Sequence, residues 1–510
     1  MDRKEQFIKQ ITDGYTFKGE SFTIGGAMLD GETIKGLHVK VPLSTLNRHG
    51  LIAGATGTGK TKSLQVMAEQ LSEKGIPVLL MDLKGDLSGL AKPSPGHPKI
   101  DERMEKIGLQ FTPNGYPVEM LSLTGKEGTQ LRATVSEFGP ILLSRILDLN
   151  DTQGGIIAVL FKYADDNKLP LVDLKDLKEL IKWATGAGKK DFQEEYGRLS
   201  TASTGSILRK IVELEQQGAD IFFGETSFDI EDLMRIDDEG RGIISIIRLT
   251  DIQDKPKLFS TFMLQLLAEI YAKMPEQGDA DRPELIFFID EAHLIFRQAS
   301  KALLEQIEAI VKLIRSKGVG IYFVTQNPKD IPDEVLAQLG LKIQHALRAF
   351  TAKDRQAIRL ASQNFPLTDF YDTDEVLTSL GIGEALVTVL GRKGRPTPLA
   401  ATMMRAPNSR MDILTDKELK KVIKNSEIRE KYEEVVDKKT AYEILKAKIE
   451  KAEEKKEEVK KAKIAKREKE KPGVIEKALK SSVGRMILRE VTRSLLGVLG
   501  IGSSYRRRRR

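Results

Sequence analysis

The sequence predicts an α/β fold in which a parallel central sheet is interrupted by a helical insertion. Two short apolar runs, residues 51–53 and 285–289, have the character of buried strands; the first leads into a glycine-rich loop that contains Lys60 and Thr61, and the second leads into Asp290 and Glu291. In parallel sheets, polar residues of this kind meet at the carboxyl edge, where ligands bind. Between the two runs, from residue 131 to about residue 218, apolar residues recur at helical spacing, which predicts the inserted helices.

The composition is that of an ordinary globular chain, with 510 residues, 40% of them hydrophobic and 30% charged. The chain has no cysteine, which excludes disulfides, thiolate metal sites and a cysteine nucleophile. No apolar run approaches the length of about 18 residues that a membrane helix needs, and the first residues lack the apolar core of a signal peptide. We therefore expect a cytoplasmic protein.

The net charge of +7 is distributed unevenly along the chain. Residues 438–510 contain 24 Lys and Arg against 10 Glu, whereas residues 1–437 contain 57 Lys and Arg against 64 Asp and Glu. The body is thus acidic and the tail strongly basic. Because an acidic body does not attract phosphate over a long range, nucleic-acid binding by the body would depend on local patches or on the interior of a ring.

The first segment, residues 1–47, predicts a short helix over residues 2–15 and then short strands over residues 22–41, broken by glycines. These strands make a small β element that is too short for an independent barrel. Residues 48–130 are expected to form the first part of the core.

The loop after the first apolar run is the strongest signal in the chain. It comprises Gly54, Ala55, Thr56, Gly57, Thr58, Gly59, Lys60, Thr61 and Lys62, and it matches G-x-x-x-x-G-K-[ST] at every fixed position. Its glycines permit positive φ, so that backbone N–H groups can turn towards a phosphate at a helix N-terminus. We expect Lys60 to bind the β- and γ-phosphates of ATP and Thr61 to bind Mg²⁺. A chance Gly-rich turn is the alternative, which the strand before the loop and the helix after it disfavour.

A second strand, residues 78–81, leads into Asp82, Lys84 and Asp86. Carboxylates in this position lie where doubly wound sheets bind ligands. A loop rich in Asp and Gly is also typical of ordinary turns, so that a functional role for Asp82 or Asp86 stays open at this point.

The helical insertion, residues 131–218, contains the only tryptophan of the sequence, Trp183. A buried structural subdomain is the favoured interpretation, and a lid or a pore-facing element is the alternative. The second part of the core is expected over residues 219–415.

The second apolar run, residues 285–289, leads directly into Asp290 and Glu291. Five apolar residues followed by two carboxylates are typical of a central parallel strand with acidic groups at its carboxyl end. We expect Asp290 to hold the Mg²⁺ shell and Glu291 to polarise the attacking water. Downstream of a complete phosphate-binding loop, this pair predicts hydrolysis of ATP rather than binding alone.

The next helix carries one stripe of apolar residues and ends near Arg315, where glycines stop it. The strand that follows, residues 321–325, delivers Gln326 to the same sheet edge as Asp290. We expect Gln326 to sense the γ-phosphate or to orient water, with an ordinary strand end as the alternative.

Taken together, these motifs resemble the HerA and FtsK branch of ring-forming, DNA-translocating ATPases. The resemblance rests on the phosphate-binding loop, the strand ending in Asp290 and Glu291, and the Arg315-x-x-Gly318 turn before the strand that ends at Gln326. With Gly383-Glu-Ala-Leu-Val387 and Gly394-Arg-Pro-Thr-Pro398 included, the arrangement is similar to the bacterial YjgR-type HerA-like family over about residues 20–415.

The resemblance implies a RecA-like core that assembles as a hexamer, with ATP bound between neighbouring subunits and DNA as the substrate. It also implies that Arg315 reaches into the neighbour's site, where a planar guanidinium can neutralise charge on the γ-phosphate oxygens. Arg348 is a second candidate for this role. The alternative for Arg315 is a cation at the carboxyl end of its own helix, where the helix dipole favours it. HerA-type helicases carry a substantial N-terminal β-barrel, whereas only the short element of residues 1–47 stands before the core here, so we expect ring packing or partner binding to differ.

The composition changes after residue 415. Residues 416–471 are expected to form a charged helical or disordered linker. Within it, residues 438–471 are almost wholly Lys, Glu and Ala, which predicts a solvent-exposed helix, a coiled-coil arm or disorder. Residues 472–510 place apolar residues on one helical face among basic residues and end in a run of arginines, residues 506–510. Such a basic amphipathic tail can bind nucleic acid, an anionic membrane surface or a protein partner, or it can pack on its own ring.

The leading hypothesis for function is an ATP-hydrolysing motor, a translocase or helicase that moves DNA through a hexameric channel. The alternative from another class is an ATP-gated assembly or effector subunit whose ring binds a protein partner and moves nothing. A secretion-type coupling ATPase is a third hypothesis, which the lack of a candidate transmembrane run in the sequence disfavours.

Overall fold

A computed structural model describes residues 2–469 of the chain, except residues 279, 299, 350, 392 and 435–438. The chain divides into two compact units, Met1–Ile444 and Leu445–Arg510. Helix α17 (Ala441–Lys469) crosses this division and forms most of the described part of the charged segment. The basic amphipathic tail and its run of arginines lie outside the described residues.

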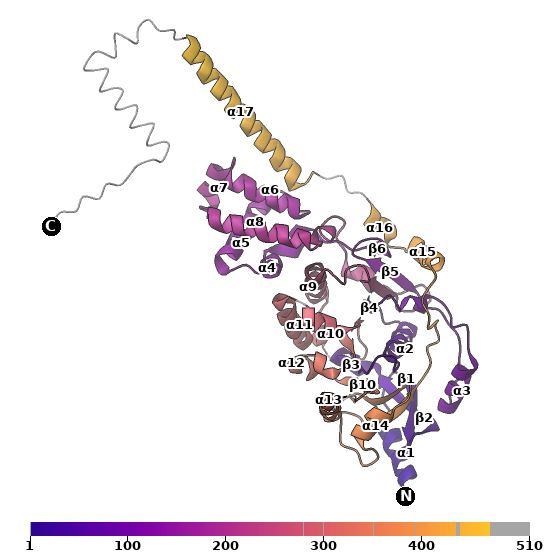
Figure 1. Cartoon of the computed structure of the whole chain (residues 1–510). Helices are drawn as coiled ribbons and strands as arrows, with labels where there is room; N and C mark the ends of the chain where they lie inside the picture. Colours follow the sequence, from indigo (N-terminus) through magenta and orange to yellow (C-terminus); the bar gives the residue numbers. More distant parts are fainter. Residues whose placement is uncertain are drawn as a thin grey trace, which may run out of the picture. The chain divides into compact units, whose positions relative to one another are not determined.

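A twelve-stranded sheet organises the described part of the first unit (Figure 1). From one edge to the other, its strands are β2 (Glu32–Pro42), β1 (Ser21–Leu29), β12 (Ala400–Met404), β11 (Glu384–Thr388), β10 (Leu341–His345), β3 (Gly50–Ala53), β9 (Val319–Thr325), β8 (Leu285–Ile289), β4 (Val78–Asp82), β7 (Ile244–Arg248), β5 (Val118–Ser122) and β6 (Thr129–Gln130). From β10 to β6 the neighbouring strands run parallel, and from β2 to β10 they pair antiparallel. The predicted α/β fold with a parallel central sheet is therefore confirmed.

The small β element near the N-terminus joins this sheet instead of standing apart from it. Strand β1 pairs with β12, which comes from the far end of the core, and β2 pairs with β1. The sequence pattern finds the strands but not this pairing, because their partner lies almost 400 residues away in the chain. The preceding helix, α1 (Arg3–Gly14), begins at Asp2, whose carboxylate accepts the backbone N–H of Glu5 at 2.7 Å as an N-cap.

Helices make up the predicted insertion between β6 and β7. They are α4 (Val135–Ile146), α5 (Asp151–Asp166), α6 (Leu174–Thr185), α7 (Lys189–Tyr196) and α8 (Thr201–Gln216). The Trp183 indole N–H donates to the Tyr163 hydroxyl at 2.9 Å, and both side chains are buried. A buried, hydrogen-bonded Trp–Tyr pair of this kind is typical of a packed structural element.

The remaining helices connect the strands of the core and continue beyond it. They are α2 (Lys60–Glu73), α3 (Pro98–Ile107), α9 (Pro256–Lys273), α10 (Ala292–Gln298), α11 (Lys301–Leu313), α12 (Asp333–Leu336), α13 (Ala352–Ser362), α14 (Thr373–Ser379), α15 (Asp416–Lys424) and α16 (Arg429–Glu433). Short 3₁₀ turns are η1 (Leu43–Arg48), η2 (Ser88–Ala91), η3 (Ala219–Ile221), η4 (Ile230–Leu233), η5 (Ile314–Lys317) and η6 (Pro328–Asp330). In the described part of the chain, no helix is long and apolar enough to cross a membrane.

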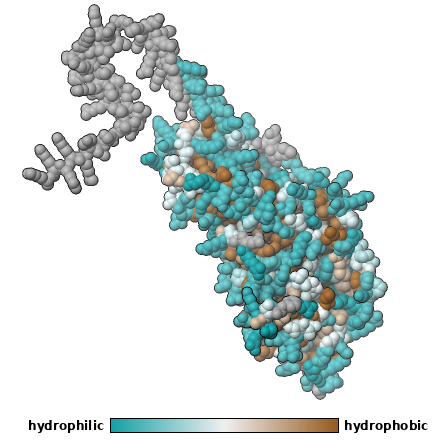
Figure 2. Space-filling model, viewed as in Figure 1, coloured by the Kyte–Doolittle hydropathy of each residue, from teal (hydrophilic) through white to brown (hydrophobic). Residues whose placement is uncertain are grey.

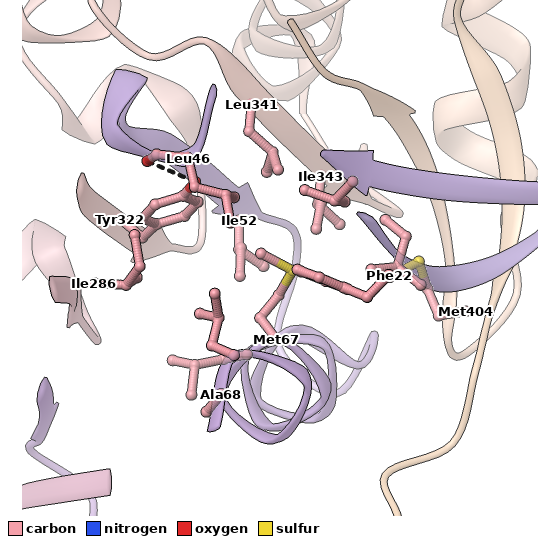
Figure 3. Packing of buried hydrophobic residues seen from close by; sticks show 14 of the residues in the cluster. Phe22, Leu46, Ile52, Met67, Ala68, Ile286, Tyr322, Leu341, Ile343 and Met404 are labelled. Carbon is pink, nitrogen blue, oxygen red and sulfur yellow. Dashed lines mark hydrogen bonds between the residues drawn. The ribbon is translucent and has the colours of Figure 1, made fainter. Parts of the chain in front are cut away.

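The core places helix α2 firmly against the sheet. Figure 3 shows Met67 and Ala68 of α2 packed below Ile52 of β3, within one cluster of buried apolar side chains. The buried Tyr322 hydroxyl donates a hydrogen bond to the carbonyl of Leu46 at 3.1 Å inside this core. Hydrophilic residues cover most of the face shown in Figure 2, where hydrophobic residues occur in small separate groups. The middle of α2 is thus held against the sheet by packing.

His49 ties the start of β3 to two neighbouring elements. Its Nε2 donates to the carbonyl of Val311 in α11 at 2.7 Å, and its Nδ1 accepts the backbone N–H of Ile321 in β9 at 3.0 Å. Only the neutral ring supplies one donor and one acceptor in this way. Burial lowers the pKa of His49 to about 4, and the nearby Arg315 contributes in the same direction.

We expect the His49→Asn variant to lose less stability in acid than the unaltered chain. The pKa of His49 is lower in the folded chain than its unfolded value of about 6.5, so its contribution is complete above that pH and is lost as the pH falls to about 4. Between pH 7 and pH 4, the unfolding free energy in urea should fall by about 3 kcal/mol more in the unaltered chain. The exposed His97, changed to Asn, serves as the control, and equal pH slopes in the chain with and without His49 would contradict the assignment.

Candidate active site

The phosphate-binding loop connects β3 to α2 and is anchored to both strands beside β3. The N–H of Gly54 donates to the carbonyl of Thr325 at the end of β9 at 3.3 Å. The N–H of Ala55 donates to the carbonyl of Ala346, just after β10, at 2.9 Å. Because the loop is bonded on both sides, its shape is set by the strand order of the sheet.

Two glycines of the loop occupy positions that a side chain would disrupt. Gly54 has φ +154°, and a Cβ there would lie 2.5 Å from the Cβ of His345. Gly59 has φ +113° and precedes the first residue of α2, and a Cβ there would lie 3.2 Å from the backbone N and Cα of Gly383. The sequence predicts glycine at these positions because the backbone has positive φ. The structure adds a second reason, because other residues approach the backbone too closely for a side chain.

The side chains of the loop differ in exposure as a phosphate site requires. Thr56 and Gly57 are exposed at the tip, and Thr61 is half-buried at the start of α2. Lys60 is buried, and its Nζ donates to the carbonyl of Ala55 at 3.1 Å. Burial lowers the pKa of Lys60, whereas the charge of Glu291 opposes that shift. An ammonium group in this position lies ready to exchange its carbonyl partner for phosphate oxygens.

Lys62, the last residue of the predicted loop, has a different partner. Its half-buried ammonium donates to the carbonyl of Met411 and, at 3.3 Å, to the Oε1 of Gln65. About two turns further along α2, the buried carboxylate of Glu69 accepts the backbone N–H groups of Asn408 and Ser409 at 2.8 and 2.9 Å. Lys62 thus ties α2 to the segment after β12, and its predicted contact with nucleotide stays a prediction.

A buried histidine supports the loop from behind. His345 at the end of β10 donates from Nδ1 to the carbonyl of Glu384 at 2.8 Å, and its Nε2 lies 2.8 Å from the hydroxyl of Ser63 in α2. Because a carbonyl only accepts, Nδ1 carries the proton and Nε2 accepts from Ser63. Burial lowers the pKa of His345 to about 4, which keeps the ring neutral and this arrangement intact near neutral pH.

Asp290 and Glu291 follow β8 directly and are both about 3% exposed. Strand β8 lies beside β9, which in turn lies beside β3, so that all three strands deliver their carboxyl ends to one edge. Glu291 has φ +47°, which is uncommon for a residue other than glycine and fixes the direction in which its side chain leaves the backbone. The predicted placement of both carboxylates at the edge of the phosphate-binding loop is what the structure shows.

The surroundings of Asp290 fit a bound cation. Its Oδ2 is buried without a hydrogen-bond partner, and burial, with Glu291 as the next cause, raises its pKa to about 7. Leaving a buried acceptor unpaired costs about 1–3 kcal/mol, and a metal ion would remove that cost. Within the described residues there is no ready cluster of three or more His, Asp and Glu side chains for a metal. Mg²⁺ suits such a site, since it usually takes one or two protein ligands together with phosphates and water.

Both carboxylate oxygens of Glu291 are engaged. Oε1 forms an ion pair with the ammonium of Lys84, and Oε2 lies 3.0 Å from Nδ1 of His293 and 3.5 Å from Nε2 of Gln326. Burial pushes the pKa of Glu291 upward, but Lys84, His293 and Lys60 outweigh it and hold the pKa below its ordinary value. Glu291 is therefore ionised, as a base must be, and the exposed Gln326 lies beside it as predicted.

The loop after β4 places Lys84 at this site. The register pairs Met81 of β4 with Ile289 of β8, so Asp82 and Asp290 are the next residues on neighbouring strands. Asp82 is fully buried and accepts the N–H groups of Gly85 at 2.6 Å and Leu87 at 3.3 Å. Burial, with Asp86 as the next cause, raises the pKa of Asp82 to about 6. The sequence left open whether Asp82 and Asp86 form a turn or have a functional role. The hydrogen bonds of Asp82 are those of a turn, whereas Asp86 has a buried Oδ1 without a hydrogen-bond partner.

Arg315 and Arg348 lie at opposite edges of the sheet. Arg315 is in η5, immediately before β9, and β9 ends ten residues after Arg315 at the phosphate-binding edge. Arg348 is exposed in the segment after β10, two residues beyond the carbonyl that accepts the N–H of Ala55. Of the two, Arg348 is thus near the chain's own phosphate-binding loop, whereas Arg315 lies before the other end of β9.

Several site residues escape the sequence patterns. Lys84 and His293 contact Glu291 directly, and His345 contacts Ser63, the residue after the predicted loop, yet each belongs to a different segment of the chain. His293 could have been found, because it follows Asp290-Glu291-Ala292 and therefore lies close to the same edge. The lysine between Asp82 and Asp86 offered a weaker signal, and His345 offered none.

Comparison with known proteins extends these observations. Residues 28–507 match the family model described as helicase HerA-like C-terminal. The DNA double-strand break repair helicases HerA of Saccharolobus solfataricus and Sulfurisphaera tokodaii are each 24% identical to the chain, over 69% of its length. The matched part spans 64% of the length of these two relatives. Among solved structures, the bacterial conjugative coupling protein TrwB, in its unbound monoclinic form, aligns over 80% of this chain and 94% of its own at 15% identity, with a TM-score of 0.49.

Proposed function

The chain belongs to the helicase HerA-like C-terminal family, and on that premise we propose that it is a Mg²⁺-dependent ATPase that moves DNA as a ring of identical subunits. The observation that carries the ATPase part is the convergence of Lys60, Asp290 and Glu291 at one sheet edge. The two HerA relatives are named as DNA repair helicases, which supports DNA as the polymer that is moved. Because ATP is the substrate, we place this activity in the cytoplasm.

In the proposed reaction, the loop from Gly54 to Thr61 cradles the phosphates with its N–H groups, and Lys60 neutralises charge on the β- and γ-phosphates. Thr61 and Asp290 would hold Mg²⁺, which supplies further charge neutralisation when bound. Water attacks the γ-phosphorus and passes a proton to Glu291, while the bond to the β–γ bridging oxygen breaks and ADP leaves. Gln326, beside Glu291, is suited to orient this water.

The ring part of the proposal concerns Arg315. Arg315 lines a hollow of about 360 Å³ at the edge opposite the phosphate-binding loop. The ionisable side chains that line this hollow are Arg48, His49, Lys312, Arg315 and Lys342. Since His49 is neutral, the hollow presents cations, which suits the phosphates of a nucleotide bound by an adjacent subunit.

Exposed apolar residues at both edges also favour subunit contacts. Leu313, two residues before Arg315, is 51% exposed, and Ile382, next to the glycine that approaches Gly59, is 71% exposed. A head-to-tail contact between such edges generates a closed ring when its rotation closes, and a hexamer is the ring we propose. The position of Arg348 near its own loop makes it the weaker candidate for action across the boundary.

DNA contact needs a source of positive charge, because residues 1–437 are acidic in total. We propose that the basic segment after residue 437 supplies part of it, with an anionic membrane surface or a protein partner as the other candidates for its tail. We also propose that the chain is divided into segments at the boundaries given in the sequence analysis, with the helical insertion at residues 131–218.

The experiment that tests the function is ATP turnover with and without double-stranded DNA, single-stranded DNA and RNA at one fixed salt concentration. Turnover should require Mg²⁺ and rise with DNA. Lys60→Ala should lose nucleotide binding and turnover. Glu291→Gln should still bind ATP but hydrolyse it at least about 10²-fold more slowly, because the base is absent. Near-normal turnover of Glu291→Gln would remove Glu291 from this role. Turnover that no nucleic acid changes would favour an assembly or effector ATPase.

We further expect Arg315→Ala to bind ATP almost normally and to hydrolyse it about 10³-fold more slowly, since an arginine finger acts on the transition state. Mixing decides whether it acts across a boundary. Inactive Arg315→Ala and inactive Lys60→Ala subunits should together recover activity, because an intact loop in one can face an intact arginine in the other. Exposed Arg297→Ala serves as a control that does not disturb the hollow. Mixed rings without recovery would assign Arg315 to its own helix end.

A further inference from the structure

The loop of Asp82, Lys84 and Asp86 has no role in the proposed reaction, although the sequence marks it. Asp82 holds the loop rigidly to the end of β4 through the N–H groups of Gly85 and Leu87. Gly85 has φ +79°, and a Cβ there would lie 3.0 Å from Thr250 and 3.2 Å from the guanidinium of Arg248. A pinned loop of this shape fixes where the side chain of Lys84 begins.

Lys84 is positioned between solvent and the proposed base. Its side chain is 46% exposed, while that of its ion-pair partner Glu291 is 4% exposed. Two other ionisable groups of the site, Lys60 and Asp290, influence both partners electrostatically. The ammonium therefore sits at the mouth of the site on a flexible four-carbon stem, free to reach a second anion nearby.

The contacts of Glu291 restrict what it can do in the absence of nucleotide. One oxygen is held by Lys84, and the other faces His293 at 3.0 Å and Gln326 at 3.5 Å. A general base must present an oxygen to the proton that it takes, within hydrogen-bond reach of the water. The ion pair with Lys84 occupies Oε1, and Oε2 lies against His293 and Gln326. The resting arrangement therefore opposes proton abstraction.

ATP changes the competition for the ammonium of Lys84. Its terminal phosphate brings more negative charge than one carboxylate, and it enters beside Lys60, at the edge where Lys84 already lies. ADP lacks this phosphate. The two nucleotides should therefore differ in their ability to draw Lys84 away from Glu291.

We propose that Lys84 is a phosphate-sensing residue: it holds Glu291 in the nucleotide-free chain and moves to the terminal phosphate of bound ATP, releasing Glu291 towards the attacking water. This inference rests on the proposed ATPase function and adds a residue and a switching step to it. Hydrolysis is thereby confined to the state in which the terminal phosphate is present.

The first test separates sensing from a structural role. Lys84→Met keeps the length of the side chain and removes its charge, so we expect affinity for a non-hydrolysable ATP analogue to fall about tenfold, ADP affinity to change less than about twofold and kcat to fall about tenfold or more. Lys84→Arg, which keeps the charge, should recover most of the preference for the ATP analogue over ADP. Lys106→Met removes a surface Lys–Glu pair of 2.7 Å on α3 and should change none of these values.

The second test follows the ion pair itself. Melting of the full chain is measured for Lys84→Met, Glu291→Gln and the double variant, which together form a double-mutant cycle. The two effects should be non-additive without nucleotide and additive with the non-hydrolysable ATP analogue and Mg²⁺. Coupling that persists with the analogue, or ATP and ADP affinities that fall equally in Lys84→Met, would overturn the proposal.

Failure of the proposed function would look different. An unaltered chain that neither binds nor hydrolyses ATP would refute the ATPase proposal. An unaltered chain that hydrolyses ATP, with a folded Lys84→Met variant that keeps normal discrimination between the ATP analogue and ADP, would refute the role of Lys84 alone. ADP binding and the melting temperature report folding of each variant independently of turnover.

Discussion

The attachment of the phosphate-binding loop to both neighbours of β3 is the constraint on which the site depends. The carbonyls of Thr325 and Ala346, at the ends of β9 and β10, accept the first two N–H groups of the loop. Because both strands run parallel to β3, their carboxyl ends and the loop share one edge. Residues that directly follow β8, β9 or β10 therefore lie at the same edge as the loop, which explains why the residues of the site come from segments far apart in sequence.

Charge balance is the second constraint on this edge. Asp290 and Glu291 are adjacent and equally buried, yet their pKa values move in opposite directions. Asp290 lacks a cationic partner on its Oδ2, whereas Glu291 is paired with Lys84. Separated pKa values in neighbouring carboxyl groups are typical of sites in which the two groups have different tasks. Here the unpaired oxygen of Asp290 is suited to a bound cation, whereas the partners of Glu291 keep that carboxylate ionised.

Buried polar residues around the site make specific hydrogen bonds that hold its elements together. The neutral rings of His49 and His345 each use one nitrogen as donor and the other as acceptor, and each joins elements that carry functional groups. The buried carboxylate of Glu69 joins α2 to the segment after β12. Through these bonds, the helix that begins at Lys60 is held at both its start and its middle, so that the loop keeps its shape while the exposed tip stays accessible.

The sequence by itself determined the local machinery: the phosphate-binding loop, the strand before Asp290 and Glu291, the strand before Gln326, and the helical insertion. Each of these features is determined by residues that are contiguous in the sequence, because strands, loops and helices form from local patterns of residues. The tertiary structure alone decided that β1 pairs with β12, that Arg315 and Arg348 face opposite edges, and that Lys84 neutralises Glu291. These outcomes follow from the order of strands in the sheet, in which β4 lies beside β8 and β10 beside β3. Strand order is set by the packing of the whole core, and no short stretch of residues encodes it.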